Sequence, residues 1–158
     1  MKNIFKKNSP TDITEELSSL LYMLDIFYKS SPEKLYDLKP YLRFRVSLFT
    51  YGVIDSYCRA KEYSDKEAMK IFAAVSPEIK RVINFDIRNL LNNQVMSKIF
   101  ADSFLVDIIS IGGNTYIDFL AGEKQKGGMS LTRFGSLIGM WQEIPVDEVE
   151  KQILANIS

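Results

Sequence analysis

The sequence predicts an all-α protein, a compact bundle of six to eight helices around a central apolar helix at about residues 41–62. Three observations predict this class. Apolar residues recur at intervals of three and four along most of the chain, which is the period of an amphipathic helix. Ser, Asp and Pro stand where such segments would begin. Residues 41–63, whose β-branched and aromatic content would also suit a strand, form too long a run for one.

The first two helices are predicted from a capping signal and from apolar content. Asp12 and Glu15 have the spacing of a capping box, so the first helix should begin near Asp12 and end before Pro32. A short helical turn follows. The segment 41–63 is apolar on most faces, which predicts burial by neighbours on several sides. We therefore expect it to be the central helix.

Five further helices are predicted after the central one. A capping box at Ser64 and Glu67 opens a short helix, and Ser76 caps the next, with Pro77 at its first position. Asn92 marks the end of that helix. The predicted ranges are about 64–75, 76–91, 97–123, 130–143 and 145–157.

Seven of the eight glycines lie between residues 110 and 141. Gly112 and Gly113 interrupt a segment whose polar residues keep helical spacing on both sides of the pair. We therefore expect the pair inside a helix, or at a kink between two collinear helices, although each glycine costs about 1 kcal/mol relative to alanine. A hairpin at this pair is the competing prediction.

Composition excludes several kinds of chemistry. Basic and acidic residues number 20 each, and ten basic residues lie on either side of Ser64, so the strong positive charge typical of nucleic-acid binding is absent. The chain has no histidine and one cysteine, Cys58, which excludes histidine-activated nucleophiles and cysteine-pair zinc sites. We expect no metal and no cofactor, no transmembrane segment, and a cytoplasmic protein.

The domain prediction is a flexible basic tail, residues 1–10, followed by a single helical domain, residues 11–158. Lys2, Lys6 and Lys7 surround two apolar residues in the tail. Three charges and two apolar groups would bind an anionic membrane weakly, so peripheral membrane contact is a minor alternative to a disordered end.

A glycine-rich stretch before the predicted helix 130–143 is a candidate anion site. The segment GEKQKGGMS, residues 122–130, lacks the lysine and hydroxyl residue of a phosphate-binding P-loop. Free backbone N–H groups, a capping serine and nearby cations could still bind an anion. The favoured interpretation is an interhelical loop without a ligand. The candidate residues are Lys124, Lys126, Gly127, Gly128, Ser130 and Arg133.

A face of small residues near the C-terminus is a candidate protein interface. Gly135 and Gly139 lie four residues apart on one helix, which allows another backbone to approach closely. Packing within the bundle is one interpretation, and a homodimer contact is the other. The predicted interface consists of Gly135, Gly139, Met140, Trp141, Val149 and Ile153.

Charged residues in the central helix suggest a candidate ligand pocket. Arg45 lies in a helix that we expect to be buried, and a buried guanidinium requires acidic or carbonyl partners. The functional interpretation is a polar pocket lined by Arg45, Tyr51, Asp55 and Tyr57. The favoured interpretation places the head of Arg45 in water at the end of the bundle.

The sequence therefore predicts a non-enzymatic helical interaction module. We expect it to bind a protein partner through its C-terminal helices and to self-associate, because catalytic motifs are absent while apolar helical faces are abundant. The alternative is a small-ligand-binding protein or enzyme that uses the polar pocket inside the bundle.

Overall fold

The computed structural model describes the backbone of residues 10–121 and 124–157 and the side chains of residues 17–121 and 133–157. This part of the chain is all-α, with seven α-helices and two short 3₁₀ helices, and contains no strand. The elements are α2 (Pro10–Lys29), η1 (Leu35–Asp37), α3 (Pro40–Ala60), α4 (Asp65–Ile83), η2 (Ile87–Leu91), α5 (Asn93–Phe100), α6 (Ser103–Leu120), α7 (Lys124–Glu143) and α8 (Glu148–Ile157).

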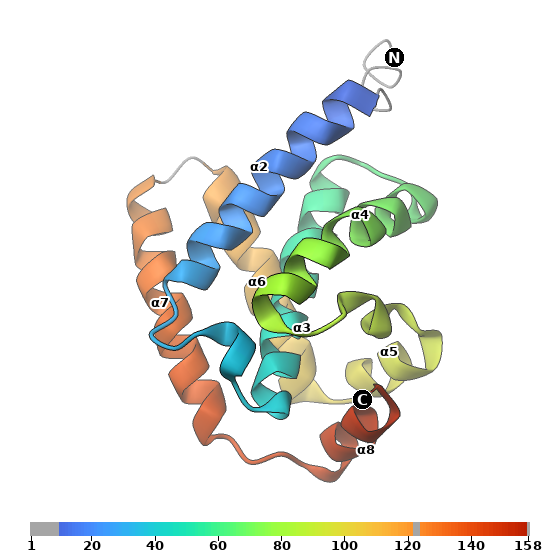
Figure 1. Cartoon of the computed structure of the whole chain (residues 1–158), viewed down its shortest axis with the longest axis vertical. Helices are drawn as coiled ribbons and strands as arrows, with labels where there is room; N and C mark the ends of the chain where they lie inside the picture. Colours follow the sequence, from blue (N-terminus) through green and yellow to red (C-terminus); the bar gives the residue numbers. More distant parts are fainter. Residues whose placement is uncertain (1–9, 122–123, 158) are drawn as a thin grey trace.

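Helix α3 is central, as its apolar content predicted. It packs against α2, α4, α6, α7 and α8, and Figure 1 shows it running through the middle of the molecule beside α6. Seven consecutive residues, 44–50, are buried, so every face of the helix is covered over this stretch. The prediction of a helical bundle around a central apolar helix is confirmed.

Helices α3 and α6 run side by side in the same direction. The Arg45 guanidinium lies over the Phe104 ring at one end of the pair, and Tyr57 contacts Tyr116 at the other. Between these ends the backbones touch through glycine. A Cβ atom on Gly112 would overlap the Phe49 carbonyl group. Close approach of the two helices therefore requires glycine at this crossing.

The glycine pair lies inside a continuous helix. Gly112 and Gly113 are both buried within α6. This confirms the prediction that helical spacing continues across the pair, and it excludes the hairpin. Gly52 completes the contact from α3, because a Cβ there would overlap the Ile109 carbonyl oxygen. Sequence spacing located the pair correctly, and close packing explains why alanine does not replace it.

The predicted break at Ser76 is wrong. The Ser64–Glu67 capping box is present, but α4 then runs without interruption through Pro77. Proline has no N–H to donate to the carbonyl four residues earlier, that of Ala73. The Ser76 hydroxyl donates to this carbonyl instead, at 3.1 Å. Ser76 therefore satisfies a backbone carbonyl inside a continuous helix, whereas it was expected to begin a new one.

The predicted helix 76–91 is also wrong. Helix α4 ends at Asn84, which adopts the left-handed conformation with a φ of 52°, and residues 87–91 form a 3₁₀ helix. Asn92 begins α5 instead of ending a helix, since its side chain accepts from the Gln94 and Val95 N–H groups. Asp102 caps α6 in the same way and divides the predicted segment 97–123 in two.

Substitution of the glycines should separate close packing from simple helix propensity. Gly112→Ala should lower the free energy of unfolding by about 2 kcal/mol or more, because the added methyl group overlaps backbone. Gly139→Ala is the matched control: no atom lies within 4 Å of its added methyl group, so alanine should stabilise the helix by about 0.5 to 1 kcal/mol. Urea denaturation of both variants measures the difference, and equal effects would contradict the crossing described above.

Candidate functional site

Arg45 forms the most extensive polar cluster in the described part of the chain. Its side chain is completely buried, and its Nε and Nη2 atoms donate to the two carboxylate oxygens of Glu150 at 2.8 and 2.7 Å. The guanidinium also donates to the carbonyls of Ile144, at 2.7 Å, and Pro145, at 3.3 Å, and to that of Trp141. We call this arrangement the Arg45 clasp.

Two aromatic rings complete the surroundings of the guanidinium. The ring centres of Tyr41 and Phe104 lie 5.0 and 4.8 Å from its central carbon. Both distances fall within the range of a cation–π interaction. The charge is therefore satisfied by a carboxylate, three carbonyls and two ring faces. Every N–H group of the Arg45 side chain is directed at an acceptor in this chain, which leaves no donor for a ligand.

The predicted pocket around Arg45 is not formed. Asp55 lies ten residues, or about 15 Å, farther along α3 and pairs with the exposed Arg59 at 2.8 Å. Tyr51 stacks on Phe72, and Tyr57 contacts other tyrosines. The interpretation that placed the Arg45 head in water is also wrong. Both failed because the partner of Arg45 is 105 residues away in the sequence.

The six residues of the predicted interface do not form one exposed face. Trp141 and Ile153 are completely buried in the core of their own chain, so neither is available to a partner in this fold. Gly135 packs within the chain, with the Ser30 carbonyl oxygen 3.1 Å from the position of an added Cβ. Gly139, Met140 and Val149 are exposed. The prediction of a continuous interface through all six is wrong.

The candidate anion site falls mostly outside the described side chains. Helix α7 begins at Lys124, six residues before the predicted start, so Gly127, Gly128 and Ser130 lie within a helix and not in a loop. Side chains 122–132 are not described. Arg133 is exposed and lines a small hollow with Asp118. Anion binding stays a prediction, as does membrane contact through the tail, residues 1–9, which is also not described.

Burial raises the pKa of the Cys58 thiol to about 12, so the thiolate is scarce at neutral pH. No three acidic or cysteine side chains in this part of the chain are placed to hold a metal ion. No described helix is long and apolar enough to cross a bilayer.

Two aspartates join the cap of α6 to the cap of α8. Asp102 accepts from the Leu105 N–H at 3.1 Å, and Asp147 accepts from the Glu150 N–H at 2.8 Å. The two carboxyl groups also contact each other. Burial and this contact raise the pKa of Asp102. The backbone N–H of Glu150, together with Asp102, lowers the pKa of Asp147. As the pH falls, Asp102 therefore takes up a proton before Asp147 does.

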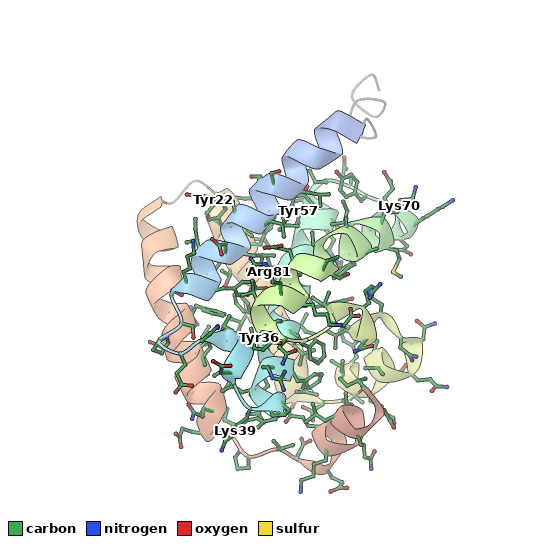
Figure 2. The ribbon with its side chains drawn as sticks, viewed as in Figure 1. Tyr22, Tyr36, Lys39, Tyr57, Lys70 and Arg81 are labelled. Carbon is green, nitrogen blue, oxygen red and sulfur yellow. The ribbon has the colours of Figure 1, made fainter. Side chains whose placement is uncertain are left out.

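An apolar groove lies at the other end of the α3–α6 pair from the Arg45 clasp. Its volume is about 280 Å³. We call it the α2–α6 groove, and its lining residues are Ser19, Leu20, Met23, Tyr57, Lys61, Tyr116, Phe119 and Leu120. Tyr22 and Tyr57 both lie toward the end of the molecule that carries the N-terminus (Figure 2).

The rim of the α2–α6 groove exposes large apolar side chains. Phe119 is 45% exposed and Leu120 is 54% exposed. Ile117, one turn before Leu120, and Tyr22, beside Met23, are exposed more fully still. Phe119 and Leu120 thus expose apolar surface at a concave feature, which is the pattern of an interaction surface.

Comparisons with protein-family models, with curated proteins and with solved structures found no match for this chain.

Sequence reasoning missed the partners of Arg45. Glu150 was not singled out, although it lies three residues before Ile153 and seven before Ile157, on the apolar side of α8. An acidic residue in phase with buried positions is a signal of burial beside a cation. Nothing local in the sequence indicates which cation. Asp102 and Asp147 carried no such signal, since an aspartate at a helix start is ordinary.

Replacing one charged residue of the Arg45 clasp should lower the free energy of unfolding far more than replacing both. Arg45→Met or Glu150→Met alone leaves one buried charge unpaired and should cost about 3 to 5 kcal/mol of stability. The double variant Arg45→Met with Glu150→Met leaves neither charge and should lose much less. Denaturant titration of the three chains measures this coupling. Additive losses would show that the pair is not energetically linked.

Stability should depend on pH through Asp102. Because the pKa of Asp102 is higher in the folded state than in the unfolded chain, its protonation stabilises the fold at pH values below the ordinary aspartate pKa of 3.8. This stabilisation is lost as the pH rises through the raised pKa. Asp147, whose pKa is lowered, stabilises the fold while it is ionised, and this contribution is lost only at more acidic pH. Acidification from neutral pH should therefore first stabilise the fold through Asp102.

The variant Asp102→Asn tests this dependence and keeps a good capping side chain. The free energy of unfolding of the parent minus that of the variant should be higher at about pH 4.5 than at about pH 7. Titrating groups that do not contact Asp102 are common to both chains and cancel in this difference. If the parent and the variant differ in free energy of unfolding by the same amount at both pH values, the pKa of Asp102 is not raised in the folded state.

Proposed function

We propose that this chain works by binding another protein at the α2–α6 groove. The observation that carries the proposal is that exposed Phe119 and Leu120 line an apolar hollow, while Ile117 and Tyr22 on the same two helices, α6 and α2, are also exposed. Exposed apolar side chains around such a hollow are the usual anchors of a protein interface. The binding surface thus moves from the C-terminal helices to the opposite end of the bundle.

The groove is suited to a partner that inserts an apolar side chain. Leu20, Met23 and the faces of Tyr57 and Tyr116 line it, and methionine adapts to side chains of different shape. Lys61 lies at the groove with its ammonium 5.9 Å from the Tyr57 ring centre. A partner with an apolar anchor flanked by a carboxylate matches these groups best.

A small apolar ligand is the second candidate occupant. A volume of about 280 Å³ is close to the lower end of ligand pockets, which is roughly 300 Å³. This candidate predicts a small-molecule adduct in native mass spectrometry that disappears with Met23→Trp, because the larger side chain fills the groove. A protein partner leaves no such adduct.

Photo-crosslinking in the cells that naturally make the protein tests the first candidate. Phe119 would be replaced by the photoreactive amino acid benzoylphenylalanine, which keeps an aromatic ring at the rim. Irradiation should give one discrete crosslinked protein, because the ring is within reach of the bound partner. Mass spectrometry of the product identifies it, whether it is another protein or a second copy of this chain.

Phe100 provides the matched control for this experiment. It is a phenylalanine with 56% exposure on α5, away from the groove. The same replacement there should give no discrete product, and Leu120→Ser should remove the product formed from position 119. An identical product from both positions, or none from position 119, would refute binding at the α2–α6 groove.

A further inference from the structure

A small hollow lies between α6 and α7, the helix along the side of the bundle (Figure 1). Its volume is about 90 Å³. We call it the α6–α7 hollow, and its described lining residues are Phe49, Ile111, Asn114, Thr115, Asp118, Arg133, Phe134 and Leu137. The α6 residues among them recur at intervals of three and four, so they form one stripe along the helix. The α2–α6 groove uses a different face of α6, that of Tyr116, Phe119 and Leu120.

The α6–α7 hollow has an apolar floor and a polar rim. Phe49 and Phe134 are almost completely buried, and their ring centres lie 5.0 Å apart. By contrast, Asn114, Asp118 and Arg133 are exposed, which places an amide, a carboxylate and a guanidinium around the opening. A few polar groups that converge on an apolar surface are the usual composition of a small-ligand site.

The two charged groups of the rim come from different helices. Asp118 lies on α6 and Arg133 on α7. Within the described part of the chain, neither forms an ion pair. Four other arginines each bind a carboxylate of this chain: Arg45, Arg59, Arg81 and Arg88. The rim therefore presents one charge of each sign to whatever enters the hollow.

We propose that the α6–α7 hollow binds a small zwitterionic α-amino acid, of the size of glycine or alanine. The ligand carboxylate accepts from the guanidinium of Arg133, whose paired N–H groups match a carboxylate. The ligand ammonium donates to Asp118, and the Asn114 amide supplies a further donor for the ligand carboxylate. A lone anion is attracted by Arg133 but repelled by Asp118, and a lone cation meets the reverse. A ligand with both charges matches the rim best.

The size of the hollow limits the side chain of the ligand. A volume of about 90 Å³ holds roughly three water molecules, at about 30 Å³ each in the liquid. The hydrogen or methyl group of glycine or alanine fits over the rings of Phe49 and Phe134. A leucine side chain exceeds this volume, so affinity should fall from alanine to leucine.

NMR titration of the isotope-labelled full-length chain with glycine and with L-alanine tests the proposal. The signals of the Arg133 Nε–H and of the Asn114 side-chain amide should shift and saturate at millimolar ligand, because both groups donate to the ligand carboxylate. Acetate and glycinamide each keep only one of the two charges, so each should bind at least about tenfold more weakly. Both amino acids are neutral overall at neutral pH, so their addition does not screen the rim as a salt does.

Two rim variants and one matched control locate the binding. Arg133→Gln and Asp118→Asn each remove one exposed charge, so neither should change the melting temperature appreciably. Each should weaken alanine binding at least about tenfold. Arg59→Gln removes an exposed arginine on α3 and should leave the affinity unchanged. Leu120→Ser, which alters the α2–α6 groove, should also leave it unchanged, so the two sites can fail separately.

Three outcomes would overturn the proposal. One is the absence of saturable shifts at Arg133 and Asn114 with either amino acid. Another is an affinity that both rim variants leave unchanged. The third is saturable binding of acetate or inorganic phosphate that Asp118→Asn strengthens, since the hollow would then be an anion site.

Discussion

The fold depends on satisfying a guanidinium that is buried at one end of the α3–α6 pair. Arg45 is completely buried on the central helix, and an unpaired charge at such a position would cost several kcal/mol. Its partners are the end of α7, the connection after it and the first turn of α8. Arg45 therefore helps to set the position of residues 141–157, together with the buried side chains of Trp141 and Ile153.

The pair formed by α3 and α6 gives this charge a fixed place. Glycines at the crossing bring the two backbones into contact, and contacts between backbones leave little freedom for sliding. Phe104 at the start of α6 is thereby held over Arg45. At the opposite end the same pair brings Tyr57 against Tyr116 and forms the floor of the α2–α6 groove. Both candidate sites are consequences of one helix pair.

Local patterns predicted the fold better than the site. The apolar central helix, the Ser64–Glu67 cap and the helical phase through Gly112 depend on residues within one or two turns of each other, and each was predicted correctly. Asn92 was misassigned because an asparagine can end one helix or cap the next. The clasp was missed for a different reason: Arg45 and Glu150 are joined only by the tertiary fold, and no periodicity relates positions 105 residues apart.

The arrangement of the two sites has a physical consequence for how they can act. Helix α8 packs chiefly on α3 and α5, whereas the groove is built from α2, α3 and α6. The shared element is α3, whose backbone is held against α6 by glycine contacts between the two sites. Departure of α8 would remove contacts at one end of this pair without changing its spacing at the other. Coupling between sites requires an element with two arrangements that both sites bias. Because the backbones of α3 and α6 are in contact at their crossing, this pair has one arrangement and not two. Partner binding at the groove and loosening of α8 should therefore be thermodynamically independent.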